Sequence, residues 1–194
     1  QQNNSVDSRI VAALERVSQA FRVLLWNEGK ENSLSPIQVQ VLIFFLFFIA
    51  DKRKVSYLAD AFNMSKATIS ETVKSLEEKK LISKEYNKQA TRSYTLYLTS
   101  KGKKLAIGAS HFAGELQTPI HKLTAADKES LLLSLLDIIR HLNQQGVITI
   151  QRMCFTCVHY QASANGNNHF CNLLNQKLAS TDLRIDCPEY AVAR

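Results

Sequence analysis

Apolar side chains recur every three or four residues in the N-terminal part of the chain, which is the spacing of one face of an α-helix. This pattern predicts an amphipathic helix over residues 6–27, followed by the polar break NEGKENS. A second helix is predicted to begin at Ser35 as N-cap, with Pro36 in its first position. It contains the apolar run 41–50, which is about half the length that a bilayer requires. We interpret this run as a buried helix and expect no membrane segment.

The next segment, KVSYLADAFNMSKATISETVKSLEEKKLI, predicts two short helices around a turn at Asn63-Met64, with Ser65 as the cap of the second. The period then changes to two in LISKEY and SYTLYLT, which favours a β-hairpin with NKQATR at its tip. A helix, a helix-turn-helix and a hairpin, in that order, are typical of a winged helix-turn-helix, whose second helix enters the major groove of DNA.

Helical spacing returns after the hairpin. It predicts one helix that begins at Thr99 and is loosened by Gly108 and Gly114, and another that begins at Thr124 and ends near Gly146. Beyond residue 147 the periodicity is lost. The predicted fold is therefore mainly α with a small β-hairpin wing. It comprises a domain over 1–147 and a small, irregular, cysteine-rich appendage over 148–194.

Charge is concentrated in the predicted winged helix. The chain has a net charge of +7, and residues 51–104 hold 13 Lys/Arg against 6 Asp/Glu, so the rest of the chain is neutral. A basic block favours a polyanionic partner because cations laid on phosphates release counterions; a solvated basic surface is the alternative. The predicted DNA contacts lie on the recognition helix and the hairpin tip: Ser65, Lys66, Thr68, Ser70, Lys74, Lys88 and Arg92.

Three stretches, LSPIQVQVL, VSYLADAFNMSKATISETVKSLEEKKLI and TRSYTLYLTSKG, resemble the MarR family of transcriptional regulators. In the third stretch, Arg92 followed by Leu98-Thr99 and Gly102 matches the wing signature of that family, whose arginine reaches into the minor groove. Two positions depart from the pattern. Ala90 replaces the usual acidic residue that helps to hold the wing arginine. Lys80 replaces a glycine at a position that commonly favours a left-handed backbone.

The resemblance implies a winged helix-turn-helix over residues 34–104 and dimerisation helices over 6–27 and 100–143. It further implies a cytoplasmic homodimer that binds double-stranded DNA at a pseudo-palindromic operator and has no enzymatic activity. Repression is the commoner mode of action in the family, and some members bind a small-molecule effector. The polar start QQNNSVDSR lacks the pattern of a signal peptide, in keeping with a cytoplasmic protein.

All four cysteines lie in the tail, with the spacing Cys154-x2-Cys157-x13-Cys171-x15-Cys187. Four thiolates in a short segment are what tetrahedral zinc or an iron–sulfur cluster requires, and a metal would stabilise a tail too short to bury much core. We predict these four cysteines as metal ligands, with zinc first and an iron–sulfur cluster as the alternative. Disulfides and free thiols stay open. His159 and His169 are potential ligands, but we expect them to lie beside the ligands or at the surface.

The predicted metal site either stabilises the tail or senses redox state. Two alternative functions remain. One is a thiol–disulfide oxidoreductase that uses Cys154 and Cys157, although VITIQRM is too short to provide the βαβ context of such enzymes. The other is a metal-stapled protein-interaction module. The sequence contains no GxSxG, P-loop or HExxH motif, so no common hydrolase or nucleotide-binding class is indicated.

Overall fold

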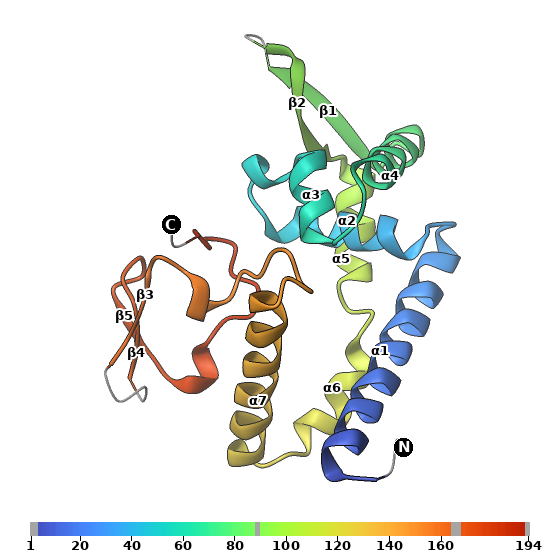
Figure 1. The fold of residues 1–194 in the computed structure, drawn as a ribbon. Helices are drawn as coiled ribbons and strands as arrows, with labels where there is room; N and C mark the ends of the chain where they lie inside the picture. The colour runs from blue at the N-terminus through green and yellow to red at the C-terminus, as the bar shows by residue number, and fades with distance from the viewer. Residues whose placement is uncertain (1–3, 88–89, 164–167, 193–194) are drawn as a thin grey trace. The chain divides into compact units, whose positions relative to one another are not determined.

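The computed structural model describes residues 4–87, 90–163 and 168–192 and divides into two compact units. The first unit contains Gln1–Lys54 and Ser70–Pro119, and the second contains Val55–Ile69 and Ile120–Arg194. Figure 1 shows the helices, the hairpin and the small C-terminal sheet. The boundary that the sequence pattern placed at residue 147 does not coincide with this division by contacts, and it stays a prediction.

Helix α1 (Val6–Glu31) begins where predicted, with Ser5 as its cap, but continues through the residues predicted as a break. It ends in a left-handed turn at Ser33 (φ 52°), after which the Leu34 amide donates to the Gly29 carbonyl at 2.8 Å. This is the usual hydrogen bond of a Schellman C-cap. A Cβ on Gly29 would lie 2.3 Å from the Leu34 carbonyl oxygen, so this return of the chain requires glycine.

Helix α2 (Pro36–Phe47) confirms the first part of the apolar run as a buried helix, but it ends before residues 48–50, and Phe47 and Ile49 are exposed. Ser35 caps the helix, and the side chain of Gln38 completes a capping box. Gln38 is itself buried, and its Nε2 donates to Ser75 Oγ at 3.0 Å, so the polar end of the helix is satisfied within the first unit. The apolar residues of α2 with the least exposure are Val39, Val41, Leu42 and Phe45. None of the helices in the described ranges is long and apolar enough to span a membrane.

The wing follows helix α4 (Lys66–Glu78) and is a two-stranded antiparallel hairpin. Strand β1 (Ile82–Asn87) pairs with β2 (Ala90–Leu98), with Ile82 opposite Leu98. Between α4 and β1, Lys80 has a φ of 58°, which confirms the left-handed backbone expected at this position.

The chain continues from β2 into α5 (Ser100–Ala109), capped by Thr99 as predicted. The single helix predicted after the wing is divided, because residues 110–113 separate α5 from α6 (Gly114–His121).

The second unit contains α3 (Val55–Ala61), the turn into α4, and α7 (Ala125–Gln144), which Thr124 caps. Its tail holds two short 3-10 turns, η2 (Cys154–Thr156) and η3 (Ser180–Asp182). The tail was predicted as irregular, but it also contains a three-stranded antiparallel sheet in the order β3 (Tyr160–Ala162), β4 (His169–Cys171), β5 (Gln176–Leu178). Leu136 of α7, Met153 and Leu183 form a buried apolar cluster that joins the tail to α7.

Candidate nucleic-acid interface and cysteine cluster

Helix α4 has the two faces expected of a recognition helix. Ile69, Val73 and Leu76 are buried, as the apolar stripe predicted. Lys66, Ser70 and Lys74 are exposed at four-residue intervals, which places them on one side of the helix. Their side chains thus form a continuous polar strip that can meet phosphates or base edges.

Ser65 and Thr68 also have a structural role at the start of α4. The Ser65 hydroxyl accepts from the Thr68 amide at 3.1 Å, and the two side-chain oxygens are 2.8 Å apart. This is an N-cap, which satisfies an amide that the helix leaves unpaired. Both residues remain exposed, so capping and DNA contact are compatible. Glu71, whose charge opposes phosphate, is exposed on the same helix and was not considered from the sequence.

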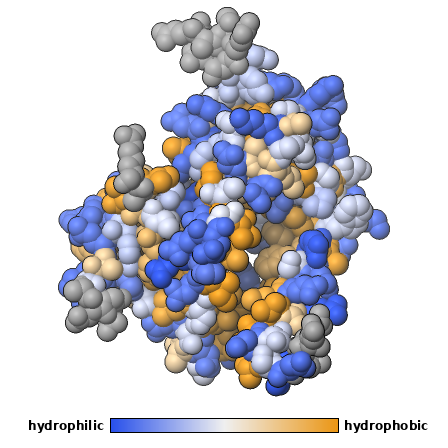
Figure 2. Space-filling model, in the orientation of Figure 1, coloured by the Kyte–Doolittle hydropathy of each residue, from blue (hydrophilic) through white to orange (hydrophobic). Residues whose placement is uncertain are grey.

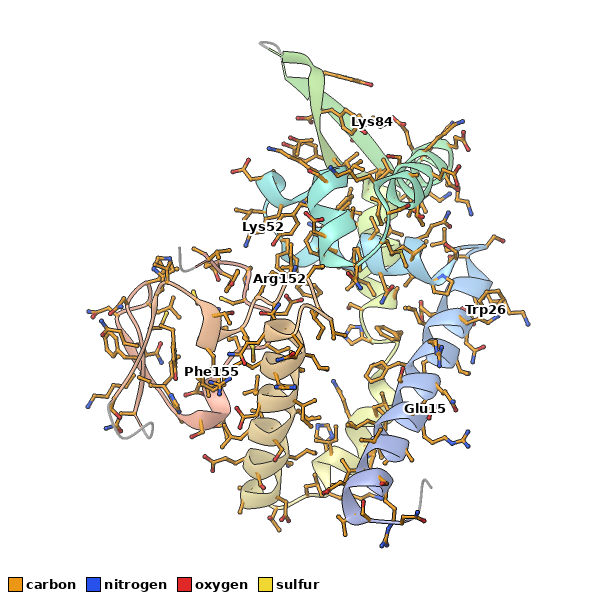
Figure 3. The ribbon with its side chains drawn as sticks, in the orientation of Figure 1. Glu15, Trp26, Lys52, Lys84, Arg152 and Phe155 are labelled. Carbon is orange, nitrogen blue, oxygen red and sulfur yellow. The ribbon has the colours of Figure 1, made fainter. Side chains whose placement is uncertain are left out.

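The predicted contacts at the wing tip fall where little is described. Lys88 lies outside the described residues, and so does the side chain of Arg92, although its backbone is in β2. At the base of the wing, Lys84 donates to Glu77 Oε2 at 2.6 Å, and this hydrogen bond is the main cause that raises the pKa of Lys84. Lys84 (labelled in Figure 3) is therefore paired within the protein, despite belonging to the basic block.

The four cysteines line one cavity of about 30 Å³ in the second unit. All four are free thiols. Cys154 begins the turn η2 and Cys157 follows it, Cys171 ends β4, and Cys187 lies beyond η3. In the described part of the chain, however, no three or more His, Cys, Asp or Glu side chains are arranged as a metal site. The four predicted ligands therefore lie around one small cavity, but their side chains are not arranged to coordinate an ion.

Two kinds of group surround these sulfur atoms. Burial raises the pKa of the Cys154 thiol, and the nearby Cys187, Cys157 and Cys171 raise it further. Arg184 supplies donors: its backbone amide lies 3.3 Å from Cys154 Sγ, and its Nη1 lies 3.6 Å from Cys187 Sγ. Such N–H groups stabilise thiolates. A low pKa is what makes a cysteine nucleophilic, so the raised value of Cys154 argues against the oxidoreductase alternative.

The two histidines near the cysteines differ in position. His159 lines the cavity. His169 is buried, with its Nδ1 2.7 Å from the Tyr160 hydroxyl oxygen, and its ring stacks on that of Tyr160. Only His159 is therefore placed to compete with a cysteine for a bound ion.

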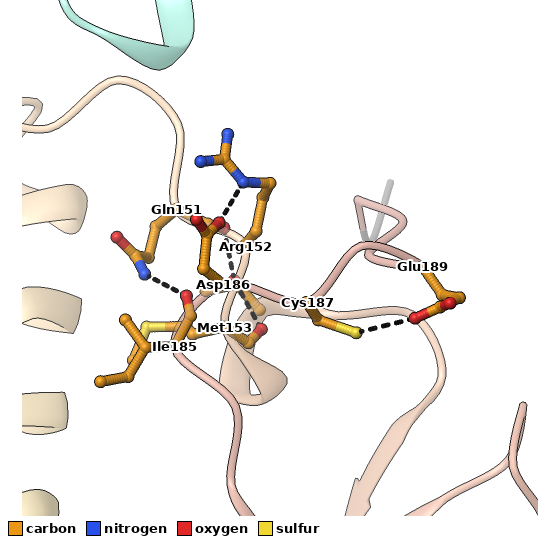
Figure 4. A network of polar contacts seen from close by, with 8 residues as sticks. Gln151, Arg152, Met153, Ile185, Asp186, Cys187 and Glu189 are labelled. Carbon is orange, nitrogen blue, oxygen red and sulfur yellow. Dashed lines mark hydrogen bonds and ion pairs between the residues drawn. The ribbon is translucent and has the colours of Figure 1, made fainter. Parts of the chain in front are cut away.

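An ion pair between the buried Arg152 and the half-exposed Asp186 lies beside the cysteines and was missed in the sequence. Arg152 is 8% exposed, and its Nε donates to the Asp186 carboxylate (Figure 4). Burial opposes the charge of Arg152, but its hydrogen bonds and the charges of its partners Asp186 and Tyr57 outweigh this effect and raise its pKa. The one available signal was that these two charged residues stand next to the cysteine knuckle and to the last cysteine.

Comparison with solved structures identifies the fold. The chain superposes on MepR of Staphylococcus aureus in complex with DNA with a TM-score of 0.60 and 22% identity, covering 68% of this chain and 97% of MepR. The chain has the winged-helix fold of MepR.

MepR in its DNA-binding conformation gives a TM-score of 0.56 at 22% identity over 69% of this chain and 98% of that one. A third structure, of MepR as regulator of the multidrug efflux pump MepA, gives 0.52 at 22% identity over 67% and 96%. No family model and no curated protein sequence matches this chain. The predicted fold class is confirmed, and about a third of the chain has no counterpart in MepR.

Proposed function

We propose that the protein is a sequence-specific DNA-binding transcriptional regulator of the MarR type, acting as a repressor and without catalytic activity. The observation that carries this proposal is the exposed strip of Lys66, Ser70 and Lys74 on α4, in a fold shared with a regulator solved on DNA. The concentration of the whole net charge in residues 51–104 supports it, because phosphate contacts supply much of DNA affinity.

In this proposal α4 lies in the major groove and the wing reaches the adjacent backbone or minor groove. Lys66 and Lys74 contact phosphates, and Ser70 contacts phosphate or a base edge. Ser65 and Thr68 cap the helix and bring its positive N-terminal end toward the DNA. Lys88 and Arg92 are assigned to the wing contact by the sequence resemblance alone.

The regulator is proposed to act as a homodimer on a pseudo-palindromic operator. Apolar residues at helical spacing on α1 are exposed in the single chain, and a second copy would remove them from water. These residues are Ile10, Val11, Leu14, Val17 and Phe21. Trp26, 61% exposed, also projects from α1 (Figure 3), and further apolar residues are visible among the hydrophilic ones in Figure 2. A cytoplasmic location and a small-molecule effector belong to the same proposal and rest on the sequence resemblance.

Substitutions in the proposed contacts test DNA binding. We expect Arg92→Ala to weaken binding to an operator selected from random duplexes by roughly 5- to 100-fold, the usual effect of losing a specific arginine contact. Lys66→Ala should lower the slope of log affinity against log salt by about 1, since one phosphate contact is lost. Fluorescence anisotropy over a salt series measures both effects.

The matched control is Lys177→Ala, which removes an exposed lysine from β5 of the tail. It should leave affinity and salt slope unchanged. If Arg92→Ala and Lys66→Ala bind as tightly as wild type, the assignment of α4 and the wing to DNA is wrong.

For the tail we propose a four-cysteine site for one zinc ion. Two observations support it: four free thiols line one cavity, and N–H groups of Arg184 face two of the sulfurs. The described residues contain no group of three or more His, Cys, Asp or Glu side chains arranged as a metal site, so the sulfurs would have to move to bind the ion. An iron–sulfur cluster stays the alternative.

Elemental analysis after anaerobic purification tests the site. We expect one zinc per chain in the wild type and its loss in Cys171→Ser, because three thiolates hold zinc less tightly than four. His159→Ala is the control, since this side chain lines the same cavity but is not a proposed ligand. Absence of both zinc and iron, or zinc that depends on His159 but not on Cys171, contradicts the proposal. Iron with visible absorbance would replace zinc by the cluster.

A further inference from the structure

Arg152 is a buried cation that neither DNA contact nor metal ligation explains. Both its backbone and its side chain contact residues beside the cysteines. Its carbonyl accepts from the Cys187 amide at 2.9 Å, and its side chain pairs with Asp186, the residue before Cys187 (Figure 4). In the chain it stands two residues before Cys154. Any change in the position of Cys154 or Cys187 therefore moves one half of this ion pair.

The same arginine also contacts the helix-turn-helix. Tyr57 of α3, the first helix of that motif, faces its guanidinium closely enough for a side-chain hydrogen bond between them to raise the pKa of Arg152. A second bond links the same elements nearby, because Thr149 Oγ1 donates to the Asp60 carbonyl at 2.6 Å. Both contacts lie inside the second compact unit. The tail thus holds the first helix of the helix-turn-helix at two points, one on each side of its middle.

Helix α3 in turn sets the start of the recognition helix. It is only seven residues long, and isolated helices of this length are not stable in water. Its last turn passes directly into the turn at Asn63, where the Met64 amide donates to the Ala59 carbonyl at 2.8 Å, and then to the cap at Ser65. External contacts on α3 are therefore expected to affect the position of Lys66 at the start of α4.

The segment that carries Asp186 is held to the cysteine knuckle by hydrogen bonds. Residues 184–189 contain no helix or strand, and four hydrogen bonds tie their backbone to residues 151–154: Cys154 N to Arg184 O, Arg184 N to Cys154 Sγ, Gln151 Nε2 to Ile185 O and Cys187 N to Arg152 O. An ion bound to Cys154, Cys157 and Cys187 would add a cross-link across these bonds. Without the ion, the segment is held by these hydrogen bonds but lacks that cross-link, so Asp186 separates from Arg152 more readily.

We propose that zinc binding at the four cysteines strengthens DNA binding through the Arg152–Asp186 pair and its contact with Tyr57 on α3. This inference rests on the proposed function, both for the DNA site and for the zinc site. Binding free energies are linked reciprocally, so DNA should also tighten zinc binding by the same factor. The tail is then a metal-responsive control of the helix-turn-helix in addition to a stabilising element.

The test compares DNA affinity of the full chain with and without zinc, using duplexes selected in parallel by zinc-loaded and chelator-treated protein. For wild type we expect affinity to fall by roughly 10-fold or more when zinc is removed, within the usual range of allosteric coupling. The double variant Tyr57→Phe/Thr149→Val removes both contacts to α3 and no proposed zinc ligand. It should keep one zinc per chain, and removal of zinc should change its DNA affinity by less than about 2-fold.

Tyr190→Phe is the matched control, since the Tyr190 hydroxyl donates to the Thr156 carbonyl inside the tail. It should lose as much DNA affinity as wild type when zinc is removed. The coupling alone is overturned by either of two results. One is a wild-type protein that binds zinc but has the same DNA affinity with and without it. The other is a double variant that loses as much DNA affinity as wild type when zinc is removed. A chain that binds DNA but no zinc overturns the metal proposal together with the coupling, and a chain that binds zinc but no DNA overturns the proposed DNA function.

Discussion

Gly102→Ala is expected to destabilise the first unit by about 3 kcal/mol, the upper part of the range for overpacked sites. A Cβ at this position would lie 1.9 Å from the Leu81 carbonyl oxygen and 2.8 Å from its carbonyl carbon. Both are backbone atoms, so no side-chain rotation relieves the overlap. The Leu81 backbone is also held in place, because the Thr99 amide donates to its carbonyl at 3.1 Å. Urea denaturation followed by circular dichroism measures the loss.

Gly108→Ala provides the matched control in the same helix. Nothing lies within 4 Å of the Cβ that alanine would add there. Alanine is the better helix former, so this variant should gain up to about 1 kcal/mol. The two Gly→Ala substitutions are six residues apart and should change the free energy of unfolding in opposite directions. This difference is expected because a Cβ on Gly102 would lie against the Leu81 carbonyl and one on Gly108 would contact nothing. If Gly102→Ala is as stable as Gly108→Ala, α5 does not meet the loop before the wing as the structure has it.

The wing signature in the sequence can now be assigned physical roles. Thr99 caps α5 through the Gly102 amide, and its hydroxyl also donates to the Lys80 carbonyl at 2.8 Å. Gly102 permits the approach to Leu81, and Lys80 supplies the left-handed residue that ends α4. These residues hold the end of the recognition helix, the base of the wing and α5 together. This part of the motif is therefore structural, whereas Arg92 is its proposed DNA contact.

Most helix starts could be predicted because an N-cap is a local interaction. Ser35, Ser65, Thr99 and Thr124 each accept from an amide three residues ahead, so the residue type and the sequence that follows contain the information. The predicted end of α1 was wrong because its C-cap does not depend on residue type alone. Its C-cap depends on the close return of Leu34 over Gly29, which polar composition does not reveal.

The tail shows where prediction from the sequence stops. Its strands are three residues long, too short for an alternating pattern to be recognised, and β4 lies between strands from either side of it. The four cysteines that their spacing grouped line one cavity in the fold, and their role as metal ligands stays a prediction. The Arg152–Asp186 pair spans 34 positions in the chain, and no local pattern reports a pairing at that separation.

Leu136→Ala is expected to cost the second unit about 2–5 kcal/mol, the usual range for a leucine lost from a core. Leu136 is fully buried on α7 and packs with Met153 and Leu183 of the tail, so truncation leaves a cavity where the tail meets the helix. Because Met153 stands next to both Arg152 and Cys154, the variant should also weaken zinc binding. Leu131→Ala is the same change on the same helix at a side chain that is 42% exposed, and it should cost less than about 1 kcal/mol. Limited proteolysis with mass spectrometry should show faster cleavage in residues 148–194 of Leu136→Ala only; equal cleavage in both variants would mean that the tail does not depend on α7 for its stability.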